Sequence, residues 1–174
     1  MTLLVVLSEL LCSLMLSGPK ADNAAVLAAF GRAEVYVEKS YNYYCRMHNY
    51  MYLEHQDGKT DISRDDWDAV VLPLADKIAM NLDQALAELE SVMPAPNKIK
   101  KGDFWSKVYY GVFENWEFYR DFFREMDFYQ SEYLMRVFGY PSYLYMYLAL
   151  IDNKFENIES SLAELREQAE TLKK

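Results

Sequence analysis

Four side chains that can bind a soft or borderline metal ion recur along residues 45–55. They are Cys45, His48, Met51 and His55, at intervals of three, three and four residues. An α-helix places such positions within about 60° on either side of one line along its surface. Thiolate, imidazole and thioether groups are ligands for copper or zinc. The pattern therefore suggests a metal-binding helix face.

The length of this stretch argues against a single ion. Cys45 and His55 lie about 15 Å apart along a helix axis, so one ion cannot reach both. Cys45 and His48 are the one pair close enough to chelate, and they need further ligands from another helix. The chain holds only two Cys and two His, so Cys12 is the remaining candidate. We expect no metal and no other cofactor, and keep Cys45 and His48 as the alternative site.

Other arrangements of catalytic residues are missing from the sequence. A carboxylate-bridged di-metal bundle needs Glu-x-x-His motifs, and the chain has none. Covalent haem attachment needs Cys-x-x-Cys-His, which is also missing. There is no P-loop, dinucleotide-binding glycine motif or nucleophile elbow. We therefore expect a protein that is not an enzyme.

Long helices with apolar stripes must position any site in this chain. Across residues 144–172, apolar side chains recur at alternating intervals of four and three, the a/d pattern of a helix packed along its whole length. Residues 103–139 carry the same rhythm in aromatic side chains, and further stripes cover 26–51 and 71–92. The sequence predicts an all-α fold: an elongated, antiparallel, up-down four-helix bundle of long helices with an extra short N-terminal helix.

Local signals mark the start of the helix that carries the stripe over residues 71–92. Ser63 and Asp66 form a capping box, with Asp in place of the usual Glu. Ile62 and Trp67 stand at the positions of a hydrophobic staple. Pro73 falls inside this helix, so we expect a kink or a restart there.

One domain is expected for residues 1–174, with residues 1–18 as its apolar N-terminal helix. Residues 3–16 have the length of a signal-peptide core, but Glu9 interrupts them and no Lys or Arg precedes them. The run is also too short to span a bilayer. We expect this helix to be retained in a cytoplasmic protein; the alternative is export, with residues 1–24 as the signal.

The charge of the chain bears on its partners. The formal net charge is −9 at pH 7. An acidic surface repels the phosphates of nucleic acids and anionic membranes. We expect no direct binding of nucleic acid and no membrane span, and a basic protein partner suits this charge best.

The aromatic residues exceed what one helix face can bury: there are 15 Tyr, 9 Phe and 3 Trp. In the helix that Asp103 is placed to cap, Phe118, Phe122 and Tyr129 lie off the predicted stripe, as does Tyr110. Large rings left at a surface are typical anchors of protein interfaces. We predict that the first three rings contact a partner, bordered by four carboxylates that steer it: Glu117, Asp121, Glu125 and Glu132.

Two functions follow. The first is a non-catalytic acidic helical protein that binds and regulates or inhibits a protein partner, of the immunity, anti-defence or regulatory-subunit type. The second is a small-molecule or metal carrier that uses the bundle interior. A third interpretation leaves the aromatic surplus as packing, covered by the N-terminal helix and by Tyr36, Tyr43 and Tyr50. The bundle outline alone does not choose among them.

Overall fold

The computed structural model describes residues 23–56, 62–129, 155–156, 160–168 and 170, without the side chains of residues 52–56. Within these ranges the labelled α-helices are α2 (Asn23–Gln56), α3 (Arg64–Asp66), α4 (Leu72–Glu90), α5 (Phe104–Val108) and α6 (Glu114–Arg124). Two π-helical turns, η1 (Trp67–Val71) and η3 (Tyr109–Phe113), and a short 3₁₀ turn, η2 (Pro96–Lys98), lie between them.

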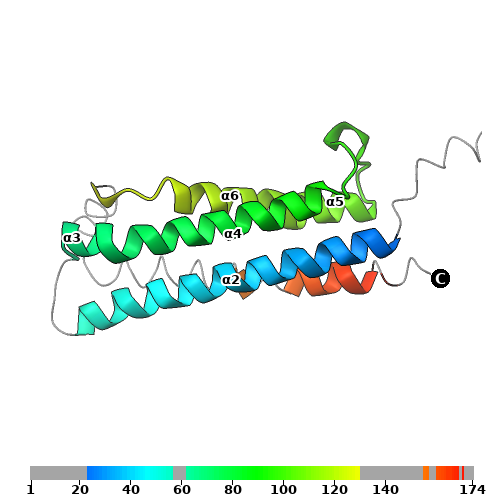
Figure 1. The fold of residues 1–174 in the computed structure, drawn as a ribbon. Coiled ribbons are helices and arrows are strands. Elements are labelled where there is room, and N and C mark those ends of the chain that lie inside the picture. The colour runs from blue at the N-terminus through cyan, green and yellow to red at the C-terminus, as the bar shows by residue number, and fades with distance from the viewer. Residues whose placement is uncertain (1–22, 57–61, 130–154, 157–159, 169, 171–174) are drawn as a thin grey trace, which may run out of the picture.

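Successive helices run in opposite directions, as the ribbon in Figure 1 shows for α2, α4 and α6. Residues 160–168 form a further helical segment beside α2, and Arg166 pairs with Glu34 of α2 at 2.7 Å. The described part of the chain is therefore all-α, without strands, and its four helical segments pack antiparallel. The predicted N-terminal helix, residues 1–18, lies outside the described residues.

Each segment buries one apolar stripe in a common core. On α2 the predicted stripe is buried throughout, and its one polar member, Ser40, donates a hydrogen bond of 3.1 Å to the carbonyl of Ile78 on α4. Phe155, Leu162 and Leu165 are 0%, 2% and 4% exposed, which confirms the predicted phase of the last stripe where it is described. The other positions of that stripe lie outside the described residues.

Aromatic contacts join three of the segments around Phe155. Its ring stacks on Tyr44 at 5.4 Å between centroids and lies 5.7 Å from Tyr41, so it packs against α2. It also lies 6.0 Å from the ring of Tyr119 on α6. Because aromatic pairs favour such offset and tilted arrangements, this cluster helps to fix α2, α6 and the C-terminal part of the chain together.

The start of α3 confirms the predicted cap. Ser63 Oγ accepts the Asp66 N–H at 3.0 Å, and the two staple residues, Ile62 and Trp67, are both buried. The irregularity expected at Pro73 is the wider turn η1, in which the N–H of Leu72 donates to the carbonyl of Trp67. Proline has no N–H to donate, so a wider turn before it lets the helix restart at α4.

The aromatic helix begins as expected but ends early. Asp103 Oδ1 accepts the Ser106 N–H at 2.7 Å, which caps α5. The expectation of one helix over residues 103–139 is wrong, because α6 ends at Arg124 and Glu125 has φ −93° and ψ 8°. Two residues later, the Asp127 carboxylate accepts the Tyr129 N–H at 3.0 Å. Such a side-chain to backbone bond competes with continuation of the helix.

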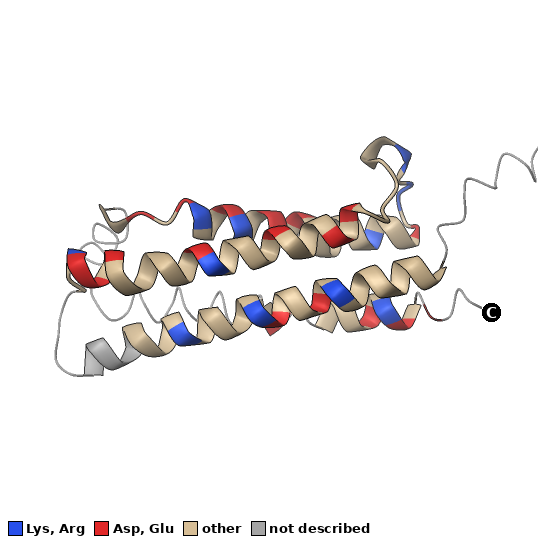
Figure 2. Cartoon of the chain, viewed as in Figure 1, with Lys and Arg blue, Asp and Glu red and all other residues tan. Residues whose placement is uncertain are grey.

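None of the helices in the described ranges has the length and apolar character needed to cross a membrane. Charged residues of both signs are interspersed along the helices, as Figure 2 shows. Some of these charges join neighbouring helices, as in the pair between Arg32 of α2 and Glu88 of α4 at 2.8 Å.

Candidate functional site

The strongest candidate site is the solvent-facing side of η3 and α6. Tyr110 and Phe118 are 59% and 64% exposed, and Glu114, Asp121 and Glu125 are exposed beside them. At about 100° per residue, positions 114, 118, 121 and 125 fall within about 60° of one another on an α-helix. We call these five residues the outer face.

The inner side of the same helix is already filled. Trp116, Tyr119 and Phe123 are buried in the core, and Val112 of η3 is buried with them. The Phe118 ring therefore stays outside, where it rests edge-on against Tyr119 with centroids 5.4 Å apart. The exposed rings of the outer face are not needed to complete the core.

The three rings predicted to contact a partner have different surroundings. Phe118 is on the outer face, whereas Phe122 is half-buried, packs against the core and meets the Phe123 ring edge-on at 5.2 Å. Tyr129 is 66% exposed but lies beyond α6, where the Arg64 guanidinium of α3 sits 5.3 Å from its ring centroid. The structure thus places Tyr129 at the end of the bundle where α3 begins.

Two of the predicted carboxylates are held by one arginine. Arg120 pairs with Asp121 at 2.8 Å and with Glu117 at 3.8 Å, and it also reaches Asp83 of α4 at 3.6 Å. The hydrogen bond from Arg120 lowers the pKa of Asp121. Asp121 is therefore ionised at neutral pH, but much of its charge is compensated by Arg120.

The remaining carboxylates differ in how available they are. Glu125 forms no ion pair with any described residue, and Glu114 is likewise unpaired within the described ranges. Glu132 lies outside the described residues. Glu114 was not among the predicted site residues, although its spacing of four from both Tyr110 and Phe118 was the signal that could have included it.

The structure describes three of the four side chains of the alternative metal-ligand set on α2. Cys45 and His48 are both half-buried, and the His48 ring lies 6.2 Å from that of Tyr44. Met51 is buried in the core, and the side chain of His55 lies outside the description. Among the described residues, no three His, Cys, Asp or Glu side chains come together in a way that would hold a metal ion.

Clearly shifted pKa values in the described part of the chain have structural causes. Burial raises the pKa of Tyr119. Hydrogen bonds to Asp68 and to Asp121 raise the pKa of Arg64 and of Arg120. Perturbed groups gather at many active sites. Here each shift follows from an ion pair or from packing between helices.

The sequence matches no family model and no curated protein, and the fold matches no solved structure. The function must therefore be argued from the outer face itself. That face offers two exposed rings and three carboxylates on one side of η3 and α6. Such a surface is chemically suited to contact with another protein.

Proposed function

We propose that this protein is a non-catalytic, cytoplasmic binding protein that regulates or inhibits a protein partner through the outer face. The observation that carries the proposal is the 64% exposure of the Phe118 ring, on a helix whose inner side is filled by other aromatic residues. Large rings that enter a partner's pocket commonly supply most of an interface's binding energy. In the complex, the partner surface that covers these rings is no longer accessible to the partner's other ligands, and this is how the protein would regulate or inhibit it.

The charge of the outer face defines the chemistry of the partner. Glu114 and Glu125 form no ion pairs within the described residues, and the whole chain has a net charge of −9. Unpaired carboxylates around an apolar centre favour a partner that presents Lys or Arg around an apolar pocket. Association should therefore slow as salt is added, because the attraction between exposed charges is screened within about 10 Å at 0.1 M salt.

We also infer that the bundle is completed outside the described ranges. The buried phase of Phe155, Leu162 and Leu165 supports a fourth long helix over much of residues 144–172. Residues 1–18 are proposed as the short N-terminal helix of the same single domain. In this arrangement the outer face stays on the outside of a continuous bundle.

The experiment compares matched variants in affinity capture from the native host. Wild-type chain, a Phe118→Ala and Tyr110→Ala double variant, and Met80→Ala serve as baits. Met80 is the matched control, because it is 64% exposed like Phe118 but lies on α4. A true partner is captured by wild type and by Met80→Ala and is depleted with the double variant.

The captured protein is then purified and its Kd is measured with each variant. We expect the double variant to weaken binding at least tenfold, about 1.4 kcal/mol, while the helical circular dichroism signal is unchanged. The proposal fails if every captured protein is retained by the double variant, or if Met80→Ala weakens binding equally. A double variant that unfolds would place the two rings in the core and would also refute the proposal.

A further inference from the structure

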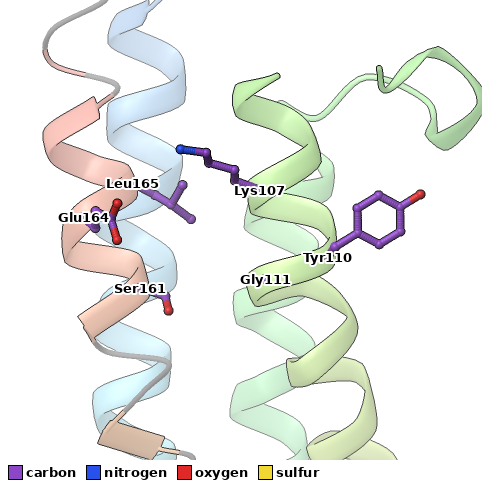
Figure 3. Close-up of a pocket in the computed structure, with 6 residues that line it drawn as sticks. All are labelled: Lys107, Tyr110, Gly111, Ser161, Glu164 and Leu165. Carbon is purple, nitrogen blue, oxygen red and sulfur yellow. The ribbon is translucent and has the colours of Figure 1, made fainter. Parts of the chain in front are cut away.

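A cleft of about 350 Å³ lies between η3 and the helical segment 160–168, on a different side of η3 from the exposed Tyr110 ring. Its size is at the lower end of the range for small-molecule pockets, about 300–1,000 Å³. Figure 3 shows the Tyr110 ring directed away from residues 161–165, so only the base of that residue borders the cleft. The cleft is lined by Lys107, Tyr110, Gly111, Ser161, Glu164 and Leu165.

Gly111 leaves the space in this cleft open. A Cβ atom added there would meet nothing within 4 Å. Its backbone does not require glycine either, since the one described glycine with positive φ is Gly102. Glycine inside a helix costs about 1 kcal/mol relative to alanine, so the fold alone does not account for its presence.

The wider turn η3 contributes to the same wall. The N–H of Glu114 donates to the carbonyl of Tyr109, and the Asn115 side chain donates to the Gly111 carbonyl at 2.9 Å. Single π-helical turns within α-helices occur frequently at functional sites. Here the turn and the glycine fall together where the cleft opens.

The chemistry of the cleft is that of an anion site over an apolar floor. Lys107 forms no ion pair with any described residue, and Figure 3 shows its side chain reaching across toward Leu165. Leu165 is only 4% exposed, and Ser161 places a hydroxyl at the same wall. Glu164, at the border of the cleft, already accepts a hydrogen bond from Gln168 at 3.1 Å.

We propose that this cleft binds a carboxylate attached to a short apolar chain. The Lys107 ammonium pairs with the carboxylate, and the apolar chain lies on Leu165 and extends into the space left by Gly111, toward Ser161. The negative charge of Glu164 disfavours a second carboxylate on the ligand. This site does not depend on the partner of the outer face, so either proposal can fail alone.

The same chemistry has two sources: a free small carboxylic acid, or the C-terminal carboxylate of a peptide that ends in an apolar residue. The probe is N-acetyl-L-leucine, titrated into the full ¹⁵N-labelled chain and followed by amide chemical shifts. We expect saturable shifts centred on Gly111, Ser161 and Leu165. N-acetyl-L-leucinamide, which lacks the carboxylate, should bind at least tenfold more weakly.

Two further ligands distinguish the sources. 4-Methylpentanoate represents the free acid, and a tetrapeptide ending in leucine with a free C-terminus represents the peptide. Tighter binding of the tetrapeptide than of N-acetyl-L-leucine assigns a chain terminus, and tighter binding of 4-methylpentanoate assigns a small acid. Either result supports the site, provided that the amide remains the weaker ligand.

Matched variants test the assigned residues. Lys107→Gln should weaken the binding of N-acetyl-L-leucine at least tenfold. Lys101→Gln, in the exposed connection between α4 and α5, should leave that binding unchanged. Gly111→Leu should abolish binding by filling the cleft, whereas Gly111→Ala should fold normally and retain some binding. Equal binding of acid and amide, unchanged binding in Lys107→Gln, or the lack of saturable shifts at these three residues would overturn the proposal.

Discussion

Residues 64–90 and 104–124 are two neighbouring helical segments built on the same plan. Each starts at a side-chain cap, Ser63 or Asp103, and each is interrupted by a π-helical turn of five residues before a longer α-helix follows. They differ in the cause of the turn. Pro73 stands two residues after η1, whereas η3 contains Gly111 and no proline.

The two segments also differ in what they present to solvent. Around η1, Trp67 and Val71 are fully buried, and α4 exposes Met80 as its one large apolar side chain. Around η3, Tyr110 and Phe118 are exposed and the cleft opens beside Gly111. The first segment has the features that folding requires. The second exposes rings that do not complete the core and keeps a glycine that costs helix stability, and those are where function should be sought.

The largest expected effect is a difference in unfolding free energy between alanine variants in the two π-helical turns, η1 and η3. Trp67 in η1 is 0% exposed, so Trp67→Ala should cost about 3–5 kcal/mol of unfolding free energy, through lost apolar contact and the cavity left behind. Its indole N–H has no hydrogen-bond partner among the described residues, so the variant loses no hydrogen bond and the expected cost is one of packing alone. Tyr110→Ala in η3 should change stability by no more than about 0.5 kcal/mol.

Urea unfolding of the two variants, followed by circular dichroism, measures both values. A Tyr110→Ala loss comparable with that of Trp67→Ala would mean that η3 is as much a part of the core as η1. The inference that residues 64–90 serve folding while residues 104–124 carry a functional surface would then be wrong.

The next effect tests whether residues 160–168 are a fixed wall for the second segment. Leu162 is 2% exposed, so Leu162→Ala should cost about 2–5 kcal/mol, the range for truncating a buried leucine. Glu164→Ala is the matched control, because that side chain is exposed on the same segment. A loss for Leu162→Ala below about 0.5 kcal/mol would show that the assigned phase is wrong.

The stripes and caps were predictable because they depend on local sequence. Ser63, Asp103 and the buried positions 112, 116, 119 and 123 follow from spacing and cap chemistry alone. Before η3 the same spacing fails: Trp105 and Tyr109 are half-buried while Val108 is fully buried. A wider turn rotates the residues before it about the helix axis relative to those after it. No proline in the sequence indicates that this turn is there.

The candidate site was predictable only in part. The exposure of Phe118 follows from its position off the stripe, but the same argument gives no reason for the half-burial of Phe122. The helix end at Arg124 could not be predicted from the stripe, because apolar spacing continues through Met126. The available signal was Asp127, whose carboxylate accepts the Tyr129 N–H. The cleft joins residues 107–111 to residues 161–165, and a contact of that sequence separation has no local signature.

A smaller change in stability, expected to have opposite signs for alanine substitutions at Gly111 and at Gly102, tests whether the fold requires Gly111. Gly111→Ala should stabilise the protein by about 0.5–1 kcal/mol, because alanine favours the helix and its Cβ meets nothing. Gly102→Ala should instead destabilise it by about 1–2 kcal/mol, because Gly102 has φ of +89°. Thermal unfolding compares the two, and destabilisation by Gly111→Ala would show that this glycine is needed structurally.

The smallest effect concerns the ion pairs that each segment uses. Arg120 lowers the pKa of Asp121, which ordinarily lies at 3.8, so the folded state binds a proton less readily than the unfolded chain. The contribution of Asp121 is thus fully present above pH 3.8 and is lost as the pH falls through the lowered folded value. Because its side chain is 51% exposed, we expect only about 0.2–1 kcal/mol at neutral pH.

Asp121→Asn should therefore be less stable than wild type at pH 7, and the difference should shrink toward zero as the solution is acidified below pH 3.8. Asp68→Asn is the control in the first segment, where Asp68 pairs with Arg64 within one helix at 2.8 Å. Arg120 also reaches Asp83 of α4, so it joins the two segments, whereas Arg64 and Asp68 both lie in one. If the Asp121→Asn difference persists in acid, the charge of Asp121 is not the source of its contribution, and the ion pair with Arg120 does not join the two segments in the way inferred from the distance.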